Sequence, residues 1–384
     1  MAQTVVDALA SRHDVTVLCG RPSYDPTERR PWRFFQTESA ARLTIIRVGS
    51  TDYPRLQMKK RIFNYLSYVL LSVPRALFLP SDVILAMTDP PFEGIVGAFV
   101  ALLKRKPFVY NIRDMYPDMA VGGSIVEPGL LSRVWEKLHR WALRQATCVV
   151  VLGEDMRNRI VSKGVPSANV SVVRDGAELL QPNSPPPRRL LDEEIIRTIR
   201  GDFQFVLLHA GNLGFYGAWD TLLAGAKELC GEGIGLVFVG EGAQSDRLLA
   251  AAKNLPNIRF LPFFPASKIS SVLAAADAHI VTVKRGLEGV VVPSKMYGIL
   301  AAGKPIVAVA PSECDVATLG QRKGFSIATD PDDPSAFAHS VRQLATDPEK
   351  LRQMAAAASA AAPAFERGGE LAKLISILEQ VARS

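Results

Sequence analysis

The chain has 384 residues, of which 48% are hydrophobic, and this is enough apolar material for two domains with separate cores. Its net charge of +7 suits a phosphorylated substrate or an anionic membrane surface, whereas the basic residues form no stripe with interleaved aromatic residues, which disfavours nucleic-acid binding. No apolar run reaches the ~18–20 residues of a transmembrane helix, and four widely spaced cysteines without a C-x-x-C pair favour free thiols in a reducing cytoplasm.

The first half of the chain alternates apolar segments with turns, which predicts strands and helices in succession. We expect helices over 2–12, 62–71, 93–103, 135–145 and 155–162, and strands over 14–19, 43–48, 82–87, 108–112, 147–152 and 170–173. Strand–helix–strand units with short loops imply parallel pairing, and ligands collect at the carboxyl ends of such strands. Asp89 and Asp114 both follow predicted strands and therefore lie at this edge of the sheet, although a turn or capping role is the alternative for Asp114 and Asp118.

The segment 59–71 combines cations with an apolar helix. Lys59-Lys60-Arg61 precedes the apolar residues 62–71, which contain aromatic side chains. This combination suits the headgroup region of an anionic membrane. A buried helix whose cations mark its solvated end is the alternative.

The second half repeats the same rhythm after a proline-rich linker over residues 181–189. The predicted fold is therefore α/β, with one Rossmann-like domain formed by residues 1–180 and a second by residues 190–365. A final amphipathic helix occupies residues 366–384. Asp330-Pro331-Asp332 is predicted to be a turn and helix cap, and no metal site is assigned.

Two loops of the second half suit a phosphate group. Gly211, Asn212 and Gly214 lie in a loop between a strand and a helix, where backbone amides face the edge of the sheet. Ser294 is predicted to cap a helix over 295–302, with Gly303 in the left-handed conformation at its end. Lys295 in the first turn is unfavourable for the helix dipole, so an anionic ligand explains it better than stability does. An ordinary loop with a lysine that reaches solvent is the alternative.

The stretch 285–305, with the core Gly-Leu-Glu-Gly-Val-Val-Val-Pro-Ser-Lys at 286–295, resembles the donor-binding signature of GT-B glycosyltransferases of family 4. The likeness is strongest to the bacterial exopolysaccharide and O-antigen subgroup of the colanic-acid type, and it covers nearly the whole chain. It implies that the domains face a cleft and that the last helix returns to the first domain. The donor-binding residues that it implies are Gly211, Asn212, Gly214, Arg285, Glu288, Gly289, Ser294 and Lys295. The family's ribose-binding glutamate corresponds to Gly298.

The resemblance further implies a retaining transfer from a nucleotide-diphosphate sugar to a hydroxyl of a lipid-linked glycan, in bacterial surface polysaccharide synthesis. No cofactor is expected beyond this substrate. Lys295, Arg285 and the amides around Gly289 would stabilise the leaving group, and Asp89 or Asp114 would orient or deprotonate the acceptor. The expected location is the cytoplasm, either free or against the inner face of the cell membrane. The alternatives are a nucleotide-sugar epimerase of the same fold and a degenerate or truncated nucleotide-sugar binder without activity.

The family's first strand and glycine loop have no counterpart in this sequence. A parallel sheet is normally paired on both edges of its central strands, so we expect a gap or an open edge in the first domain, which invites aggregation. The sequence thus predicts a poorly soluble or inactive chain, which an upstream extension of ~15–25 residues would rescue.

Overall fold

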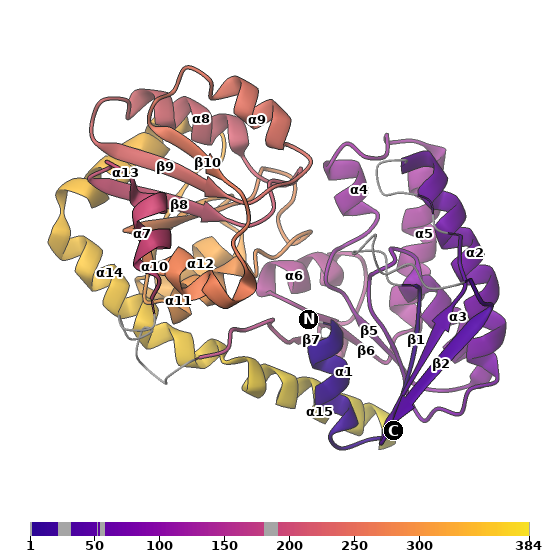
Figure 1. Ribbon diagram of the computed structural model, residues 1–384. Helices are drawn as coiled ribbons and strands as arrows, with labels where there is room; N and C mark the ends of the chain where they lie inside the picture. Colours follow the sequence, from indigo (N-terminus) through magenta and orange to yellow (C-terminus); the bar gives the residue numbers. More distant parts are fainter. Residues whose placement is uncertain (1, 22–31, 52, 54–57, 180–190, 384) are drawn as a thin grey trace.

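The computed structural model describes residues 2–21, 32–51, 53, 58–179 and 191–383. The predicted linker 181–189 lies outside the described residues, as do the side chains of Lys59, Lys60 and Arg61. Two α/β domains stand opposite each other, and the last helix connects them along one side (Figure 1). The predicted GT-B architecture is confirmed.

The first domain holds two separate sheets. One has the order β1-β3-β2 and the other the parallel order β4-β5-β6-β7. The strands are β1 Val15–Cys19, β2 Phe35–Ala40, β3 Leu43–Val48, β4 Ile84–Ala86, β5 Phe108–Asn111, β6 Cys148–Val151 and β7 Val170–Val172. The sequence did not predict β2, which pairs antiparallel with β3 and carries mostly exposed residues, so no apolar pattern marks it.

The two sheets do not join. Among the described residues, no ladder of hydrogen bonds connects β1 with β4, so each of these strands has an open edge. The gap expected in the first domain is therefore present between these two strands.

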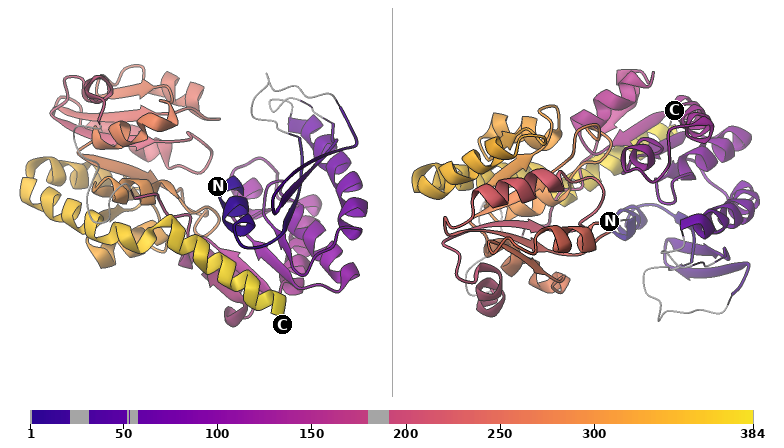
Figure 2. Two further views of the ribbon diagram at one scale, coloured as in Figure 1. Left: turned by 60° about the horizontal axis from the view of Figure 1, so that its bottom comes forward. Right: turned by 90° about the horizontal axis from the view of Figure 1, so that it is seen from above.

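The first-domain helices form layers over these sheets. They are α1 Ala2–Ala10, α2 Met58–Leu77, α3 Glu93–Lys104, α4 Asp118–Gly122, α5 Leu130–Gln145 and α6 Glu154–Ser162. Helix α3 lies between α2 and α5 and packs against both. The final helix, α15 Arg367–Arg383, runs back from the second domain and packs beside α1 (Figure 2). Leu374 and Leu378 of this helix join Val5 and Leu9 in one buried cluster, as the sequence predicted.

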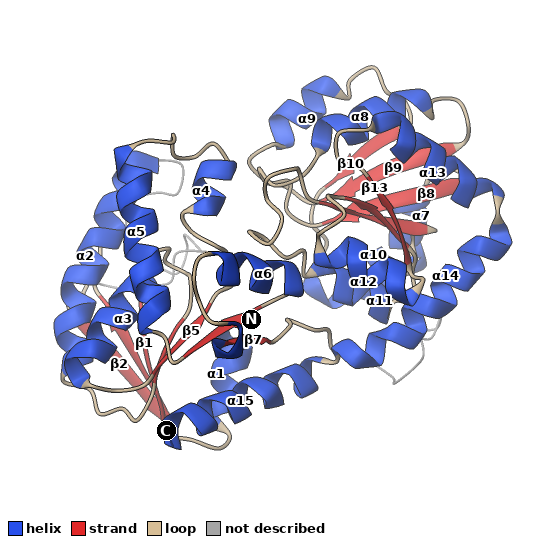
Figure 3. Ribbon diagram, turned by 180° about the vertical axis from the view of Figure 1, so that it is seen from behind, coloured by secondary structure: helices blue, strands red, loops and turns tan. Residues whose placement is uncertain are grey.

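The second domain is a six-stranded parallel sheet with the order β10-β9-β8-β11-β12-β13 (Figure 3). The strands are β8 Phe205–Ala210, β9 Ile234–Val239, β10 Ile258–Leu261, β11 Ala278–Thr282, β12 Ile306–Val309 and β13 Ser326–Thr329. The helices are α7 Glu193–Arg200, α8 Trp219–Glu228, α9 Ser245–Ala251, α10 Ile269–Ala274, α11 Lys295–Ala301, α12 Asp315–Lys323, α13 Pro334–Thr346 and α14 Pro348–Ala361. The strand order reverses between β8 and β11, and doubly wound sheets bind ligands at this switch point.

The N-termini of α6 and α12 face each other across the domains. The Asp155 carboxylate accepts a hydrogen bond from the Asp315 amide (3.0 Å), and the Asp315 carboxylate accepts one from the Glu154 amide (3.3 Å). Arg174 lies 3.0 Å from the buried Asp315 carboxylate. Each acidic side chain thus caps the helix of the other domain, which is electrostatically favourable at a helix N-terminus.

Replacement of Asp315 should therefore destabilise the whole protein. Asp315→Ala leaves Arg174 partly buried without its carboxylate, and the loss of one partner of such a pair costs about 3–5 kcal/mol. We expect a clear fall in the thermal unfolding midpoint, measured by circular dichroism. The control is Glu349→Ala, which breaks the exposed pair of Glu349 with Arg352 and should cost less than about 1 kcal/mol. Equal shifts for both variants would contradict the role given to Asp315.

Candidate active site

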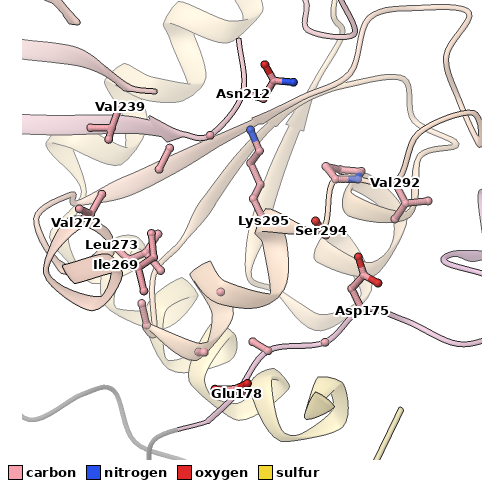
Figure 4. A pocket seen from close by; sticks show the side chains of 18 of the residues that line it. Asp175, Glu178, Asn212, Val239, Ile269, Val272, Leu273, Val292, Ser294 and Lys295 are labelled. Carbon is pink, nitrogen blue, oxygen red and sulfur yellow. The ribbon is translucent and has the colours of Figure 1, made fainter. Parts of the chain in front are cut away.

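A cleft of about 770 Å³ lies between the two domains, beside the switch point of the second sheet (Figure 4). The first domain and the segment after β7 contribute Asp114, Met119, Asp175, Gly176, Ala177 and Glu178. The second domain contributes the last residue of β9, loops that follow β8, β10 and β11, and parts of α10 and α11. The start of α15 adds Arg367. The described lining includes Gly211, Asn212, Tyr216, Phe263, Phe264, Ile269, Ser270, Leu273, Val292, Pro293, Ser294, Lys295, Gly298 and Arg367.

Lys295 is the basic side chain at the base of this cleft. Its Nζ lies 2.9 Å from Nε2 of His209, which stands near the end of β8. No ion pair with an acidic residue is found for Lys295 within the described part of the chain. Burial lowers the pKa of the Lys295 ammonium to about 7, and burial likewise lowers the pKa of His209. Such an ammonium without a counter-ion is suited to an anionic ligand.

The glycine loop after β8 approaches this lysine closely. Gly211 has a φ of +141°, and a Cβ at this position would lie 3.2 Å from Nζ of Lys295. Asn212 also lines the cleft, and its carbonyl accepts a hydrogen bond from the Tyr216 hydroxyl (2.8 Å). Gly214 lies outside the cleft lining, where its carbonyl accepts a hydrogen bond from the Trp219 indole (2.7 Å). Gly211 therefore lies against Lys295, Asn212 lines the same cleft, and Gly214 lies outside it.

The loop before Lys295 divides into two parts. Ser294 and Lys295 line the cleft, whereas Arg285, Glu288 and Gly289 do not. The exposed Arg285 guanidinium pairs with Asp330 (2.6 Å) and Asp332 (2.5 Å). The geometry therefore corrects the expectation that Arg285 reaches the donor phosphates, because two carboxylates hold it elsewhere on the surface.

Glu288 and Gly289 contact protein rather than the cleft. The Glu288 carboxylate accepts a hydrogen bond from the Gly286 amide (2.7 Å), and the Glu288 carbonyl accepts one from Arg159 of the first domain (3.0 Å). Gly289 has a φ of +63°, and a Cβ there would lie 2.4 Å from the carbonyl of Asp155. These two residues hold the loop against α6, so the structure assigns them a contact between domains.

The predicted helix cap at Ser294 is wrong in its detail. Ser294 has helical backbone angles, and its side chain makes no capping hydrogen bond. The hydroxyl is exposed and lies at the cleft instead. Gly303 has a φ of +65°, so the predicted left-handed end of the helix is confirmed. Asp330 is confirmed as a turn residue because its carboxylate accepts a hydrogen bond from the Asp332 amide, while Asp333 caps α13.

The two candidate catalytic carboxylates differ in position. Asp114 lines the cleft, its amide donates a hydrogen bond to the Thr88 hydroxyl (3.2 Å), and its backbone forms a β-bridge with Val291 of the second domain. Burial raises the pKa of the Asp114 carboxyl, although the neighbouring Arg113 opposes this effect. Asp89 is exposed and is not part of the cleft lining. The structure therefore brings Asp114, and not Asp89, to the cleft.

Two residues that line the cleft, and His209 buried behind Lys295, carried no recognisable signal in the sequence. His209 lies inside a predicted strand, where it resembled any core residue, and Asp175 and Glu178 follow β7 in a segment assigned only to the domain end. Asp175 is paired with Arg113, and Glu178 with Arg367 (2.8 Å). The only hint for His209 was its position two residues before Gly211, at the carboxyl end of a parallel strand.

Two further features bear on bound groups. Within the described residues, no cluster of three or more His, Cys, Asp or Glu side chains is arranged to hold a metal ion. Gly298 lines the cleft without a carboxylate, and a Cβ there would meet only Leu273, at 3.6 Å.

None of the described helices has the length and apolar character to cross a membrane.

Two facing Rossmann-like domains with a cleft at the switch point of the second sheet define a GT-B type of protein, and the family comparison agrees. Residues 1–176 match the model of the glycosyl transferase 4-like domain, and residues 204–347 match glycosyl transferases group 1. These two matches together span most of the chain, which therefore belongs to the family-4 glycosyltransferases of GT-B fold.

The individual relatives and solved structures have low sequence identity to this chain. The chain is 24% identical over 359 residues to the putative colanic acid biosynthesis glycosyl transferase WcaI of Escherichia coli, covering 88% of this chain and 86% of WcaI. The structure resembles Anabaena HepE in complex with UDP-glucose, with a TM-score of 0.67, 19% identity, and coverage of 86% and 85% of the two chains. It also resembles sucrose-phosphate synthase from Thermosynechococcus elongatus, with a TM-score of 0.73, 15% identity, and coverage of 100% and 93%.

The buried Lys295 charge should reduce the stability of the protein without ligand. The pKa of this group is about 7 in the folded chain against an ordinary 10.5, and each pKa unit is worth about 1.4 kcal/mol. Below pH 7 both states are protonated and the whole cost of burial applies. Between pH 7 and 10.5 only the unfolded chain holds the proton, so wild-type stability rises with pH across this window.

Lys295→Met should therefore raise the unfolding midpoint, most strongly below pH 7 and progressively less toward pH 10.5. The lost hydrogen bond to His209 offsets part of this gain. Thermal unfolding at pH 6, 8 and 10 measures the effect. Lys253→Met is the control, because Lys253 is exposed and its replacement should change the midpoint little at every pH. A destabilised Lys295→Met at pH 6 would contradict the argument.

Proposed function

We propose that this glycosyltransferase binds the diphosphate of a nucleotide-diphosphate sugar at Lys295. The observation that carries the proposal is an ammonium without an acidic partner, at the base of a cleft between two Rossmann-like domains and beside the switch point of the second sheet. An anion compensates such a charge by charge-assisted hydrogen bonds. The similar Anabaena HepE structures, which were determined in complex with UDP and with UDP-glucose, support this ligand class.

Other residues of the cleft provide places for the remaining parts of the donor, its base and its ribose. Gly211 allows backbone and ligand to approach Lys295 closely, and Asn212 offers a side-chain amide beside it. Phe263 and Phe264 follow β10 and provide aromatic surface for the nucleoside base. Gly298 and Leu273 leave open space on the far side of Lys295, where the ribose has room.

Asp114 is the proposed group that orients or deprotonates the acceptor hydroxyl. It belongs to the first domain, opposite Lys295, and burial raises the pKa of its carboxyl, which suits a base that must later release a proton. The acceptor oxygen bonds to the anomeric carbon as the bond to the diphosphate breaks, and Lys295 stabilises the departing charge. Retention at the anomeric carbon is part of this proposal.

The proposed acceptor is a lipid-linked glycan of a bacterial surface polysaccharide. The name of WcaI, a putative colanic acid biosynthesis glycosyl transferase, supports this assignment, as does the name of WbjE of Pseudomonas aeruginosa, a probable glycosyltransferase that is 25% identical to this chain over 267 residues.

Loss of Lys295 should weaken diphosphate binding selectively. Lys295→Met removes one charge-assisted contact, worth about 1.5–3 kcal/mol, so the affinity for a nucleotide diphosphate should fall roughly ten- to 150-fold. Nucleoside binding should change little, because the base and ribose do not contact the ammonium. Calorimetric titration with UDP, GDP, ADP, CDP and dTDP, and with the matching nucleosides, measures both.

Lys253→Met serves again as the control and should bind like the wild-type protein, since the exposed Lys253 lies outside the cleft lining. Equal losses for diphosphate and nucleoside would contradict the phosphate assignment. Incubation of wild type with the nucleotide sugar alone separates the alternatives, because an epimerase forms product without acceptor and a degenerate binder forms none even when a glycan acceptor is supplied.

We further propose that helices α2, α3 and α5 rest on an anionic membrane. These adjacent helices expose apolar side chains at spacings of three and four residues, which we name the apolar helical face: Phe63, Leu66, Leu70, Phe99, Leu102, Leu103, Leu131, Val134 and Leu138. Exposed cations accompany them at Arg105, Lys106, Arg133 and Lys137. Apolar residues flanked by cations suit the surface of an anionic leaflet, where each cation adds about 1 kcal/mol. A membrane position would also bring a lipid-linked acceptor to the first domain.

Removal of two leucines from this face should release the protein from vesicles. Leu66 is 60% exposed and Leu70 is 74% exposed, and each would contribute roughly 1.5–3 kcal/mol if buried in the membrane. Leu66→Ser with Leu70→Ser should thus reduce co-sedimentation with phosphatidylglycerol vesicles more than about tenfold. Leu249→Ser, on the half-exposed Leu249 of α9 in the second domain, is the control. Unchanged sedimentation of the double variant, or none with wild type, would contradict the membrane surface.

A further inference from the structure

His209 forms hydrogen bonds with the backbone of Asn212 and of Ile280, and Lys295 is the cationic side chain beside it. The His209 side chain is fully buried near the end of β8, and Nε2 lies 2.9 Å from Nζ of Lys295. The imidazole packs edge-on against Trp219, with ring centroids 5.0 Å apart, and against Phe238 at 6.1 Å. Aromatic rings on these sides leave the ring little freedom to turn, so its orientation toward Lys295 is fixed by packing.

The proton arrangement follows from the chemistry of the pair. An ammonium only donates hydrogen bonds, so the imidazole nitrogen that faces it must accept and the proton of the ring must sit on Nδ1. Burial and the adjacent Lys295 charge lower the pKa of His209, which keeps the ring neutral and able to accept. With one ammonium proton directed at His209, the other two are directed away from β8.

Few other titratable side chains lie near Lys295 and His209. His279, on the neighbouring strand β11, is also buried, and its Nε2 faces the Leu273 carbonyl at 2.9 Å. Burial lowers the pKa of His279 to about 3, so it is neutral as well. Lys304 acts on His279 from the far end of α11. In the described residues, the Lys295 ammonium forms side-chain hydrogen bonds only with His209.

We propose that His209 is a positioning residue, which accepts a hydrogen bond from Lys295 and directs the remaining ammonium protons at the donor diphosphate. This inference rests on the proposed function and adds to it the role of His209. One consequence is a change in the protonation state of Lys295 when the donor binds. A diphosphate beside Nζ favours the charged amine, so a lysine that is neutral in the empty cleft becomes protonated when the donor binds.

The pH dependence of affinity follows with a defined sign. Because the pKa of Lys295 is about 7 in the empty protein and rises in the complex, affinity is constant below pH 7 and weakens above it, by a factor that approaches tenfold per pH unit. Loss of the acceptor at 209 makes the ammonium less stable. The inflection should then move to lower pH, and binding at pH 7.5 should weaken by about tenfold for each pKa unit of that shift.

The experiment measures UDP-glucose binding by calorimetry from pH 6 to 9, in buffers of different ionisation enthalpy, so that affinity and proton uptake are obtained together. UDP-glucose is the probe because its diphosphate has no titrating oxygen in this range. At pH 8 the wild-type protein should take up close to one proton, and Lys295→Met should take up none and show a flat affinity profile. His209→Leu should shift both curves toward acid pH.

His209→Gln should restore the wild-type curves in large part, because its amide oxygen can accept from Lys295. His209→Asn keeps the amide but is too short to reach, so it should behave like His209→Leu and serves if the leucine variant does not fold. His139→Leu, which replaces another buried histidine in α5, is the control and should match wild type. Binding with the same pH curve in wild type and in His209→Leu would overturn the His209 assignment alone. Failure of wild type to bind any diphosphate in the panel would instead overturn the proposed function, and this assignment with it.

Discussion

The cleft of this protein depends on an ammonium group held at the end of a parallel sheet without a carboxylate beside it. Lys295 enters the cleft from α11, and β8 supplies His209 as its neutral neighbour. Removing such a charge from water is costly, so the surrounding core must supply the stability that keeps it in place. The reversal of strand order between β8 and β11 brings these elements together, because each strand ends at the same edge and its loop faces the first domain.

The loop 285–294 joins the phosphate chemistry to the arrangement of the domains. Its first part contacts the first domain through Glu288 and Gly289, and Met115 donates a backbone hydrogen bond to Val290 (3.1 Å). Its last part carries Ser294 and Lys295 into the cleft. A displacement of one domain therefore acts on the segment that leads directly to Lys295. The reciprocal caps between α6 and α12 stabilise the same relative position at the N-terminus of α6, beside Gly289.

The first domain combines an open sheet with an apolar exterior. Strands β1 and β4 lie in separate sheets, and α2, α3 and α5 expose apolar side chains on the helical layer. The helix α15 compensates part of this openness, since it packs with α1 over β5 and β6 and adds Leu374 and Leu378 to their core. A domain of this kind gains stability from what covers it, whether the C-terminal helix or, as we propose, a membrane surface.

The sequence by itself determined the local structure and the class of protein. Apolar runs of strand length predicted the buried strands β5, β6, β8, β9 and β12, and glycine loops after strands predicted where a phosphate could bind, because these features depend on neighbours in the chain. It missed β2, whose exposed residues leave no pattern. The tertiary structure decided which polar residues meet. Arg285 pairs with carboxylates 45 and 47 positions away, and Lys295 meets a histidine 86 positions away. Such long-range partners are set by how strands and helices are ordered in space, and no local pattern in the sequence encodes them.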